Sequence, residues 1–222
     1  SFIELQPDFA KNIIIGLAKL GGITVGIVAN QPCFYAGVLD CDSSDKASRF
    51  VRYCDSYDIP IITLTDVPGF MPGVEQEKKG VIRHGAKLLY AYAEATTIKL
   101  TVVLRKAYGG AYIAMSSKHL KADRVYAWEK AEIAVMGAEG AVEILYAKNL
   151  KELSNTEKEK FTEEKLEKYK KSYMNVNTAL AKGYVDLVIE PESTRKVLFY
   201  DLIHIKKKIK NDVVKKHGNI PL

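Results

Sequence analysis

Short β-branched runs alternate with helical patterns along the first half of this chain. Three apolar runs predict strands, at Ile23–Ala29, Ile61–Thr65 and Ile98–Leu104. Between them, apolar positions recur at helical spacing from Lys46 onward and again from about Glu75 to Ala95. Strands that alternate with helices are joined by crossover connections, so we expect an α/β fold.

The remainder of the chain predicts shorter elements and then a change of composition. We expect further strands and helices at Tyr112–Ser117, Arg124–Trp128, Glu132–Val135, Ala138–Ala147 and Val185–Ile189. Beyond Leu150 the chain is rich in Glu and Lys, and its sparse apolar positions predict an amphipathic helical appendage over residues 149–175. A long helix is expected over residues 193–216. We predict that residues 1–222 form one domain that carries both.

Composition limits the class of protein. The chain has 222 residues, of which 47% are hydrophobic and 27% charged, so it can bury a sizeable core. Its apolar runs fall well short of the roughly 20 residues of a membrane helix, and its first residues lack a secretory pattern. We therefore expect a cytoplasmic protein without a membrane span.

Cysteine and charge patterns exclude further classes. The three cysteines, Cys33, Cys41 and Cys54, form no C-x-x-C pair and are expected to be reduced. The net charge of +6 has its main source near the C-terminus, in Lys206, Lys207, Lys208, Lys210, Lys215 and Lys216. Lysines on a terminal helix without interleaved aromatic residues favour a solvated face over nucleic-acid binding.

A pair of glycines after the third apolar run is the strongest functional feature. Arg105–Met115 has the sequence RKAYGGAYIAM, in which a strand end is followed by Gly109 and Gly110 and then by a short helical pattern. Glycines there let a substrate oxygen approach the backbone, so that two successive N–H groups can hold a developing negative charge. On the motif alone, a close packing turn without a ligand explains the glycines equally well.

A second loop with glycines follows the run at Ile61–Thr65. The segment Asp66–Gly73 contains two prolines and two glycines and is expected to be a loop. Ligand clefts in open α/β sheets lie beyond the carboxyl ends of the strands, so the two glycine-bearing loops could line one cleft. The chain contains neither the phosphate-binding nor the dinucleotide-binding glycine motif.

Isolated titratable side chains give weaker indications. His84 could act as a base or contact an anion. The favoured interpretation is a helix-surface or interface imidazole, because no carboxylate partner has an obvious placement. The other three histidines show no ligand-like spacing, and Asp66 alone does not make a metal site. We expect no metal in this chain.

Several longer segments together resemble a known enzyme family. They are Thr63–Gly73, Ile82–Thr96, Arg105–Tyr112, Ser116–Leu120 and Ala131–Gly137. In this order they resemble the biotin-dependent carboxyltransferases that act on acyl-CoA. The similarity is greatest to the C-terminal half of the propionyl-CoA carboxylase β subunit, and the methylmalonyl-CoA decarboxylase α subunit is also similar.

The resemblance implies a crotonase-like fold of the ClpP/crotonase type, a spiral of ββα units, with this chain as the C-terminal carboxyltransferase half. In that family an N-terminal half holds the main CoA site. The active site forms between halves of different subunits in a dimer or hexamer. The implied partners are the N-terminal half, further copies of the subunit, biotin carboxyl carrier protein and biotin carboxylase. A eukaryotic member would lie in the mitochondrial matrix.

The same resemblance assigns the site residues. The N–H groups of Gly110 and Ala111 would stabilise negative charge on the ureido oxygen of biotin, which a separate carrier protein bears, while CO2 moves between carboxybiotin and an acyl-CoA. Neither a metal nor a protein base is required. Binding residues implied by the resemblance are Asp66, Pro68, Gly69, Phe70, Tyr108, Gly109, Tyr112 and Ile113. Ile113 lies where members of the family sense acyl size, and it leaves both propionyl-CoA and acetyl-CoA open.

Two alternatives remain beside a carboxylase component. The same residues would serve a biotin-dependent decarboxylase acting on methylmalonyl-CoA, because that reaction reverses the transfer step. The other alternative is a noncatalytic fragment that oligomerises or docks the carrier protein. We expect no appreciable transfer by the chain without an N-terminal half.

Overall fold

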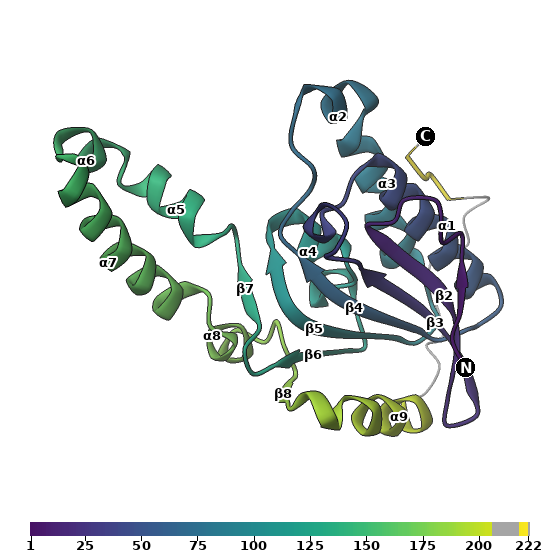
Figure 1. Ribbon diagram of the computed structural model, residues 1–222. Helices are drawn as coiled ribbons and strands as arrows, with labels where there is room; N and C mark the ends of the chain where they lie inside the picture. Colours follow the sequence, from purple (N-terminus) through teal and green to yellow (C-terminus); the bar gives the residue numbers. More distant parts are fainter. Residues whose placement is uncertain (206–217, 222) are drawn as a thin grey trace.

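One mixed sheet forms the centre of the molecule. The computed structural model describes residues 1–205 and 218–221, and within them eight strands form a single sheet (Figure 1). The strands are β1 (Ile3–Leu5), β2 (Ile13–Leu20), β3 (Ile23–Asn30), β4 (Ile61–Val67), β5 (Lys99–Tyr108), β6 (Arg124–Trp128), β7 (Glu132–Ala134) and β8 (Leu187–Ile189). Their order is β1-β2-β3-β4-β5-β6-β8, and β7 pairs with β5.

Strand β5 is the longest of these and joins two parts of the sheet. The strands β1, β2 and β3 are antiparallel, whereas β3, β4, β5, β6 and β8 run parallel, as crossover connections require. Leu100–Val103 of β5 pair with β6, and Lys106–Tyr108 pair with β7. The carboxyl end of β5 therefore extends beyond the region where β6 is its neighbour.

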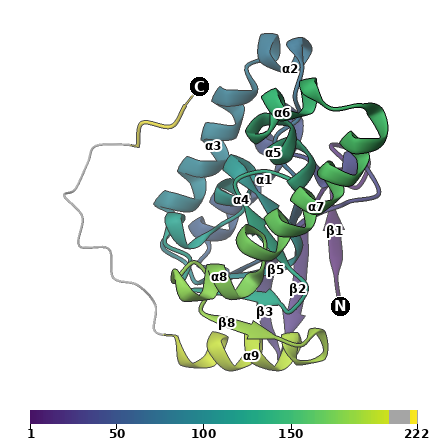
Figure 2. The same ribbon diagram turned by 90° about the vertical axis from the view of Figure 1, so that its left-hand side faces the viewer.

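Three helices cover one face of the sheet (Figures 1 and 2). They are α1 (Cys41–Ser56), α3 (Val81–Glu94) and α4 (Gly109–Ala114), and a short helix, α2 (Val74–Lys79), precedes α3. Helix α1 begins at a capping box, in which the Asp40 carboxylate accepts from the Ser43 N–H and the Ser43 hydroxyl accepts from the Asp40 N–H. Phe50 of α1 and Tyr92 of α3 are buried in the core beneath these helices.

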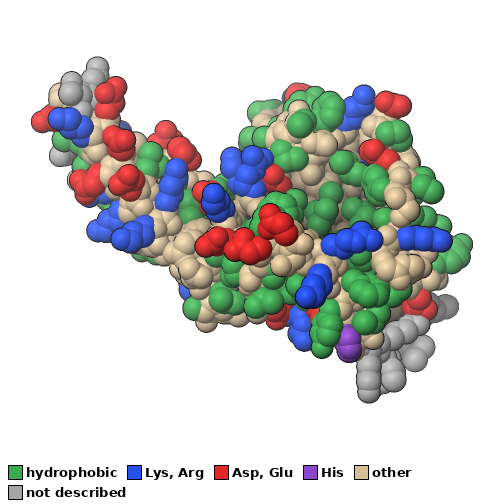
Figure 3. Space-filling model, turned by 60° about the horizontal axis from the view of Figure 1, so that its bottom comes forward, with side chains coloured by type: hydrophobic (Ala, Val, Ile, Leu, Met, Phe, Trp, Pro, Cys, Tyr) green, Lys and Arg blue, Asp and Glu red, His purple; other side chains and the backbone are tan. Residues whose placement is uncertain are grey.

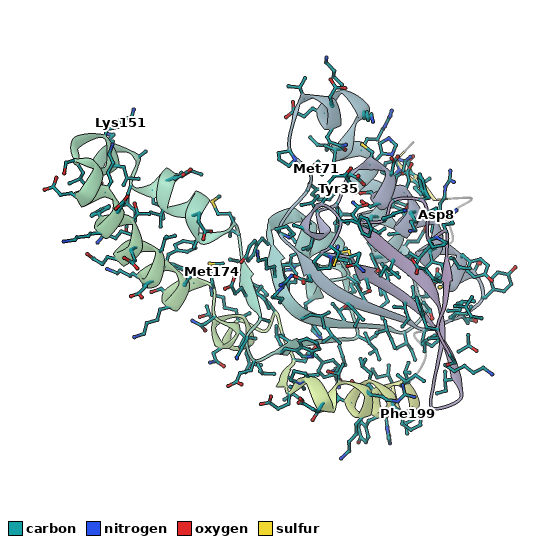
Figure 4. All side chains as sticks on the ribbon, in the orientation of Figure 1. Asp8, Tyr35, Met71, Lys151, Met174 and Phe199 are labelled. Carbon is teal, nitrogen blue, oxygen red and sulfur yellow. The ribbon has the colours of Figure 1, made fainter. Side chains whose placement is uncertain are left out.

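Helix α9 (Thr194–His204) covers the opposite face of the sheet. Its Leu198 packs in one cluster with Leu100 and Val102 of β5, which alternate along the strand with residues that face the other helices. The Tyr126 hydroxyl of β6 donates to the Asp201 carboxylate of α9. Phe199 points toward the turn between β2 and β3 (Figure 4). The sheet thus has a hydrophobic core on each face.

A helical arm projects from one edge of the sheet between β7 and β8 (Figures 1 and 2). It consists of α5 (Ala138–Leu145), α6 (Ala147–Glu152), α7 (Asn155–Tyr173) and α8 (Val176–Ala181). Acidic and basic side chains mix over its outer part (Figure 3). At its base, where Figure 4 labels Met174, this residue and Ala138 form a small buried cluster with Tyr108 of β5. The arm is therefore fixed to the strand end that precedes the paired glycines.

The structure confirms the α/β expectation and most of the predicted elements, but it corrects several boundaries. The predicted helix from Glu75 to Ala95 is wrong as one element, because Gly80 adopts a left-handed φ of 85° and separates α2 from α3. The helix predicted from Lys46 begins earlier, at Cys41. The helix predicted from Tyr112 begins at Gly109, directly at the glycine pair.

Other segments were missed or lie outside the described residues. Strands β1 and β2, helix α8 and three 3₁₀ turns were not predicted; the turns are Tyr35–Gly37, Lys118–Leu120 and Pro191–Ser193. The appendage expected over 149–175 contains most of α6 and the whole of α7. Of the helix expected over 193–216, the structure shows α9. Its remaining part, with the lysines from Lys206 to Lys216, lies outside the described residues.

Candidate active site

The two glycines of the turn after β5 stand in different environments. Gly109 has a φ of 58°, which L side chains rarely adopt, and a β-carbon on it would come within 2.9 Å of the Val135 carbonyl oxygen. The fold itself therefore requires glycine at residue 109. The close approach joins the start of α4 to the chain that leaves β7.

At residue 110, in contrast, the fold does not require glycine. Its φ is negative, it is exposed, and the nearest described atom to an added β-carbon would be Cε2 of Phe70, at 3.8 Å. This is an ordinary van der Waals distance, so the chain has room for a side chain there. Gly110 and the buried Ala111 lie in the first turn of α4, whose N–H groups have no acceptor within the helix. The turn presents bare backbone to its surroundings.

A pocket of about 460 Å³ opens beside this turn. The residues Gly109, Gly110, Tyr112 and Ile113, all predicted as site residues, line it. The outer wall comes from the helical arm and from the chain after it, through Tyr169, Tyr173, Lys182 and Tyr184. The pocket is mainly apolar, with His119 and Lys182 as cationic or polar side chains at its margin. Such a concave, largely apolar site suits a small organic group.

Tyr112 places a buried polar atom beside the pocket. Its side chain is 5% exposed, and its hydroxyl has no hydrogen-bond partner among the described residues. Burial, with a further effect from Tyr184, raises the pKa of Tyr112 to about 12, so the hydroxyl keeps its proton at neutral pH. The ring of His119 meets the Tyr112 ring edge-on. Tyr112 is therefore a protonated residue of the pocket wall.

Tyr108 connects the end of β5 to β7 and to the helical arm. Its hydroxyl donates to the Glu132 carboxylate of β7, and its ring packs on Ala138 and Met174. Burial first, and then the hydrogen bond with Glu132, raise the pKa of Tyr108. The residue directly before Gly109 is thus held on two sides.

The loop after β4 delivers one side chain to the glycine turn. Phe70 pairs with Leu39 in an isolated bridge, and its ring occupies the space beside Gly85 of α3, where a β-carbon would lie 2.8 Å from the ring. The other edge of the ring faces Gly110. Pro68 and Gly69 belong to the same loop but do not line the 460 Å³ pocket. The structure therefore brings Phe70, and not the whole loop, to the turn.

Asp66 belongs to β4 and not to the loop that the sequence predicted. It is 7% exposed, and both of its carboxylate oxygens accept hydrogen bonds from neighbouring residues of β5. Arg105 donates to it through Nε, at 3.0 Å, and forms an ion pair through Nη2, at 2.9 Å. That bond raises the pKa of the Arg105 guanidinium. Asp66 is not among the residues that line the pocket.

His84 has a carboxylate partner, contrary to the expectation from sequence. Its Nδ1 lies 2.9 Å from Oδ1 of Asp45 on α1, and the Lys87 ammonium lies 3.2 Å from the same oxygen. This cluster joins α1 to α3 away from the pocket, which agrees with the favoured interpretation of an interface imidazole. Among the described residues, no three His, Cys, Asp or Glu side chains are grouped closely enough to hold a metal ion.

Sequence reasoning missed the part of the site that comes from the arm. Tyr169 and Tyr173 lie four residues apart on α7, with ring centroids 5.1 Å apart, and this spacing was the one signal that they share a face. Lys182 and Tyr184 follow α8 and carried no signal. Within the described part of the chain, no helix has both the length and the apolar character needed to cross a membrane.

One mixed sheet with helices on both faces, and a glycine turn beside a pocket at the end of β5, agrees with the crotonase-like fold of the solved carboxyltransferases that this chain resembles. The carboxyl transferase domain family matches residues 1–220, and the chain belongs to that family. The resemblance noted from the sequence is confirmed.

Three similar proteins illustrate the match. The carboxyltransferase subunit of propionyl-CoA carboxylase from Haloferax mediterranei is 55% identical over 222 residues, which are 100% of this chain and 43% of that protein. The methylmalonyl-CoA decarboxylase α subunit of Propionigenium modestum is 50% identical over 221 residues, 100% of this chain and 42% of that protein. A solved transcarboxylase 12S, described as a hexamer with methylmalonyl-CoA and methylmalonic acid bound, superposes with a TM-score of 0.93 at 48% identity, over 100% of this chain and 42% of its own. The chain thus spans less than half the length of these relatives.

Proposed function

We propose that this chain is the C-terminal carboxyltransferase half of a biotin-dependent acyl-CoA carboxylase, which moves CO2 between carboxybiotin and an acyl-CoA. Residues 1–222 form this half, with the helical appendage over 149–175 and helix α9 as parts of it. Family membership and the names of the relatives support the reaction class.

One observation carries the proposal: Gly110 lacks a side chain although the fold has room for one. An alanine there would favour a helix, so the bare backbone is best explained by a guest that approaches it closely. Biotin, when bound, supplies CO2 and a ureido oxygen on which negative charge develops. The N–H groups of Gly110 and Ala111 point from the first turn of α4 and hold that charge by hydrogen bonds.

The remaining predicted site residues shape the surroundings. Gly109 allows the left-handed conformation of the turn, and Tyr108 connects the turn to β7 and the arm. The Phe70 ring contacts the turn beside Gly110. Tyr112 and Ile113 form the pocket wall, and Pro68 and Gly69 shape the loop that presents Phe70. Ile113 senses the size of the acyl group. Both propionyl-CoA and acetyl-CoA remain candidate substrates.

The partners follow from the same proposal. An N-terminal carboxyltransferase half supplies the main CoA site, and biotin carboxyl carrier protein and biotin carboxylase supply carboxybiotin. The hexamer described for transcarboxylase 12S supports an assembly of several copies. We place the protein in the cytoplasm, or in the mitochondrial matrix if it is eukaryotic; the rat relative is named as mitochondrial. The transfer itself requires no metal from this chain.

A decarboxylase is the second candidate. The relative from Propionigenium modestum, at 50% identity, carries that name, and decarboxylation reverses the same transfer step. The residues around Gly110 serve both directions equally.

The test replaces Gly110 by Val in the chain reconstituted with the N-terminal half of a close relative. Carboxyl transfer from carboxybiotin carrier protein to propionyl-CoA and to acetyl-CoA is measured. Blocking the approach to the N–H groups should lower transfer on the order of 10²-fold or more. Gly140→Val is the matched control, because Gly140 lies exposed on α5 with open space around it among the described residues. Full carboxyl transfer by the Gly110→Val variant would refute the proposed role of the Gly110 and Ala111 N–H groups.

A further inference from the structure

We infer that Asp66 is a positioning residue. It stabilises an irregularity in β5 and thereby determines the position of the N–H groups of Gly110 and Ala111. The consequence for transfer rests on the function proposed above. The structural part of the inference stands on contacts within this chain.

The pairing of β4 and β5 shifts register just before the glycine turn. Thr65 is paired with Val103, but Val67 is paired with Ala107. Between these pairs β4 has one intervening residue, Asp66, whereas β5 has three. A bulge of this kind bends the strand that holds the extra residues and redirects the chain after it. Here the redirected chain is the last part of β5, which leads into Gly109.

The side chain of Asp66 fills the acceptor positions that the bulge leaves open. Its Oδ1 accepts from the Lys106 N–H at 3.1 Å, so a carboxylate oxygen takes the place of a strand carbonyl. Its Oδ2 accepts from Arg105 Nε at 3.0 Å and pairs with Nη2 at 2.9 Å. Two of the three intervening residues of β5 are therefore bound to one side chain.

The backbone of Asp66 is itself fixed from the neighbouring strand. Its N–H donates to Oδ1 of Asn30, the last residue of β3, at 3.1 Å. The amide nitrogen of Asn30 donates in turn to the Gly37 carbonyl at 3.1 Å. Asn30 is 7% exposed, like Asp66. The carboxyl ends of three parallel strands thus meet at the buried side chains of Asn30 and Asp66, to which the exposed residues Arg105 and Lys106 donate from β5.

Only Ala107 and Tyr108 separate Lys106 from the glycine turn. Both lie in the short ladder with β7, and both are buried. A displacement of Lys106 is therefore passed through a packed strand directly to Gly109 and Gly110. A binding role for Asp66, which the family resemblance implied, is not favoured, because both oxygens are already occupied and the side chain does not line the pocket.

The test compares two aspartates, each of which accepts a hydrogen bond from a backbone N–H of β5. The two N–H groups lie near opposite ends of that strand. Asp123 accepts from the Lys99 N–H at 2.8 Å, at the start of β5. In amide spectra of the ¹⁵N-labelled full chain, Asp66→Ala should shift the signals of Gly109, Gly110 and Ala111. Asp123→Ala should leave these three signals in place. Unchanged signals of Gly110 and Ala111 in folded Asp66→Ala would overturn the inference.

Two milder variants keep the inference testable if Asp66→Ala does not fold. Asp66→Asn retains an oxygen for the Lys106 N–H and loses the ion pair, and Arg105→Gln removes the ion pair from the other side. Both should shift the same amide signals by less than Asp66→Ala. The absence of any shift in both folded variants would contradict the inference as well.

The transfer assay with the N-terminal half separates this inference from the proposed function. Asp66→Ala should lower kcat on the order of 10²-fold, as small misplacements of a site do, while the KM for acyl-CoA stays the same. Asp66→Asn should restore part of kcat. Displaced amide signals with full transfer would uphold the positioning and count against the function assigned to Gly110. Amide signals that stay in place reject the positioning, whatever the transfer rate.

Discussion

The ring of Phe70 stands 3.8 Å from where a β-carbon on Gly110 would lie. The loop after β4 thus reaches the turn after β5 through one aromatic edge. Because the opposite edge of the ring fills the space beside Gly85, the position of Phe70 depends on the absence of a side chain at residue 85. The exposed backbone of the turn rests on a side chain that has little freedom to move.

The two adjacent glycines should respond oppositely to alanine. Gly109→Ala should lower the free energy of unfolding by about 1–3 kcal/mol, because it forces a side chain into a left-handed backbone against the Val135 carbonyl. Gly110→Ala should leave it unchanged or raise it by up to about 1 kcal/mol. Urea unfolding of both variants checks this. Equal losses in the two would contradict the distinction.

Gly85 and Phe70 should be coupled in stability. Gly85→Ala places a β-carbon within 2.8 Å of the ring and should cost about 1–3 kcal/mol. The same change should cost less in a Phe70→Ala background, because the obstacle is gone. A double-mutant cycle measured by urea unfolding gives the coupling energy. Gly140→Ala on α5 serves as a control that should show no coupling to Phe70. Additive effects of Gly85→Ala and Phe70→Ala would argue against a contact between residue 85 and the Phe70 ring.

The stability contribution of Asp45 should depend on pH. Burial alone would raise the pKa of Asp45, but the hydrogen bonds and charges of His84 and Lys87 outweigh it and hold that pKa below the ordinary 3.8. Such a carboxylate stabilises the fold above its unfolded pKa and loses that contribution as the pH falls through the folded value. Asp45→Asn should therefore lower the free energy of unfolding by about 1 kcal/mol at neutral pH. The difference from the wild type should shrink as the pH falls below 3.8 and through the lower folded value, and a constant difference would contradict this.

The three cysteines should differ sharply in reactivity. Cys33 is exposed, whereas Cys41 and Cys54 are buried. Burial, with Asp55 adding to it, raises the pKa of Cys54 to about 12, and burial also raises that of Cys41. A thiol reagent at about pH 8 should modify one cysteine of the native chain quickly and all three after unfolding. Mass spectrometry of the modified peptides identifies the site, and rapid labelling of Cys54 would be inconsistent with its burial.

Local signals predicted the parallel strands well but missed the hairpin before them. The run Ile13–Leu20 and the strand Ile23–Asn30 are separated by Gly21 and Gly22, a typical two-residue hairpin turn. The first run was not assigned as a strand, although this spacing would have identified it. The break at Gly80 was missed for a different reason. Helical periodicity continues across it, and the left-handed conformation of one residue ends α2 and begins α3.

The candidate site was predictable only where its residues are neighbours in sequence. The glycine turn follows one strand and was found from that pattern, whereas Ile113 was assigned through the family resemblance. The pairing of Asp66 with Arg105 joins residues 39 positions apart and arises from a register shift between two strands. The arm and the chain after it supply Tyr173 and Lys182 to the pocket through tertiary packing. Such contacts depend on how elements dock, which periodicity does not encode.

The contrast between the paired glycines has a consequence inside the cell. A chain altered at Gly109 spends more time unfolded, so chaperones and proteases remove it and its abundance falls. A chain altered at Gly110 keeps its stability, escapes this surveillance and accumulates at the normal level. If several copies assemble, such a chain enters the same particles as the unaltered one. Altered and unaltered copies then share one assembly, whereas chains altered at Gly109 are largely absent from it.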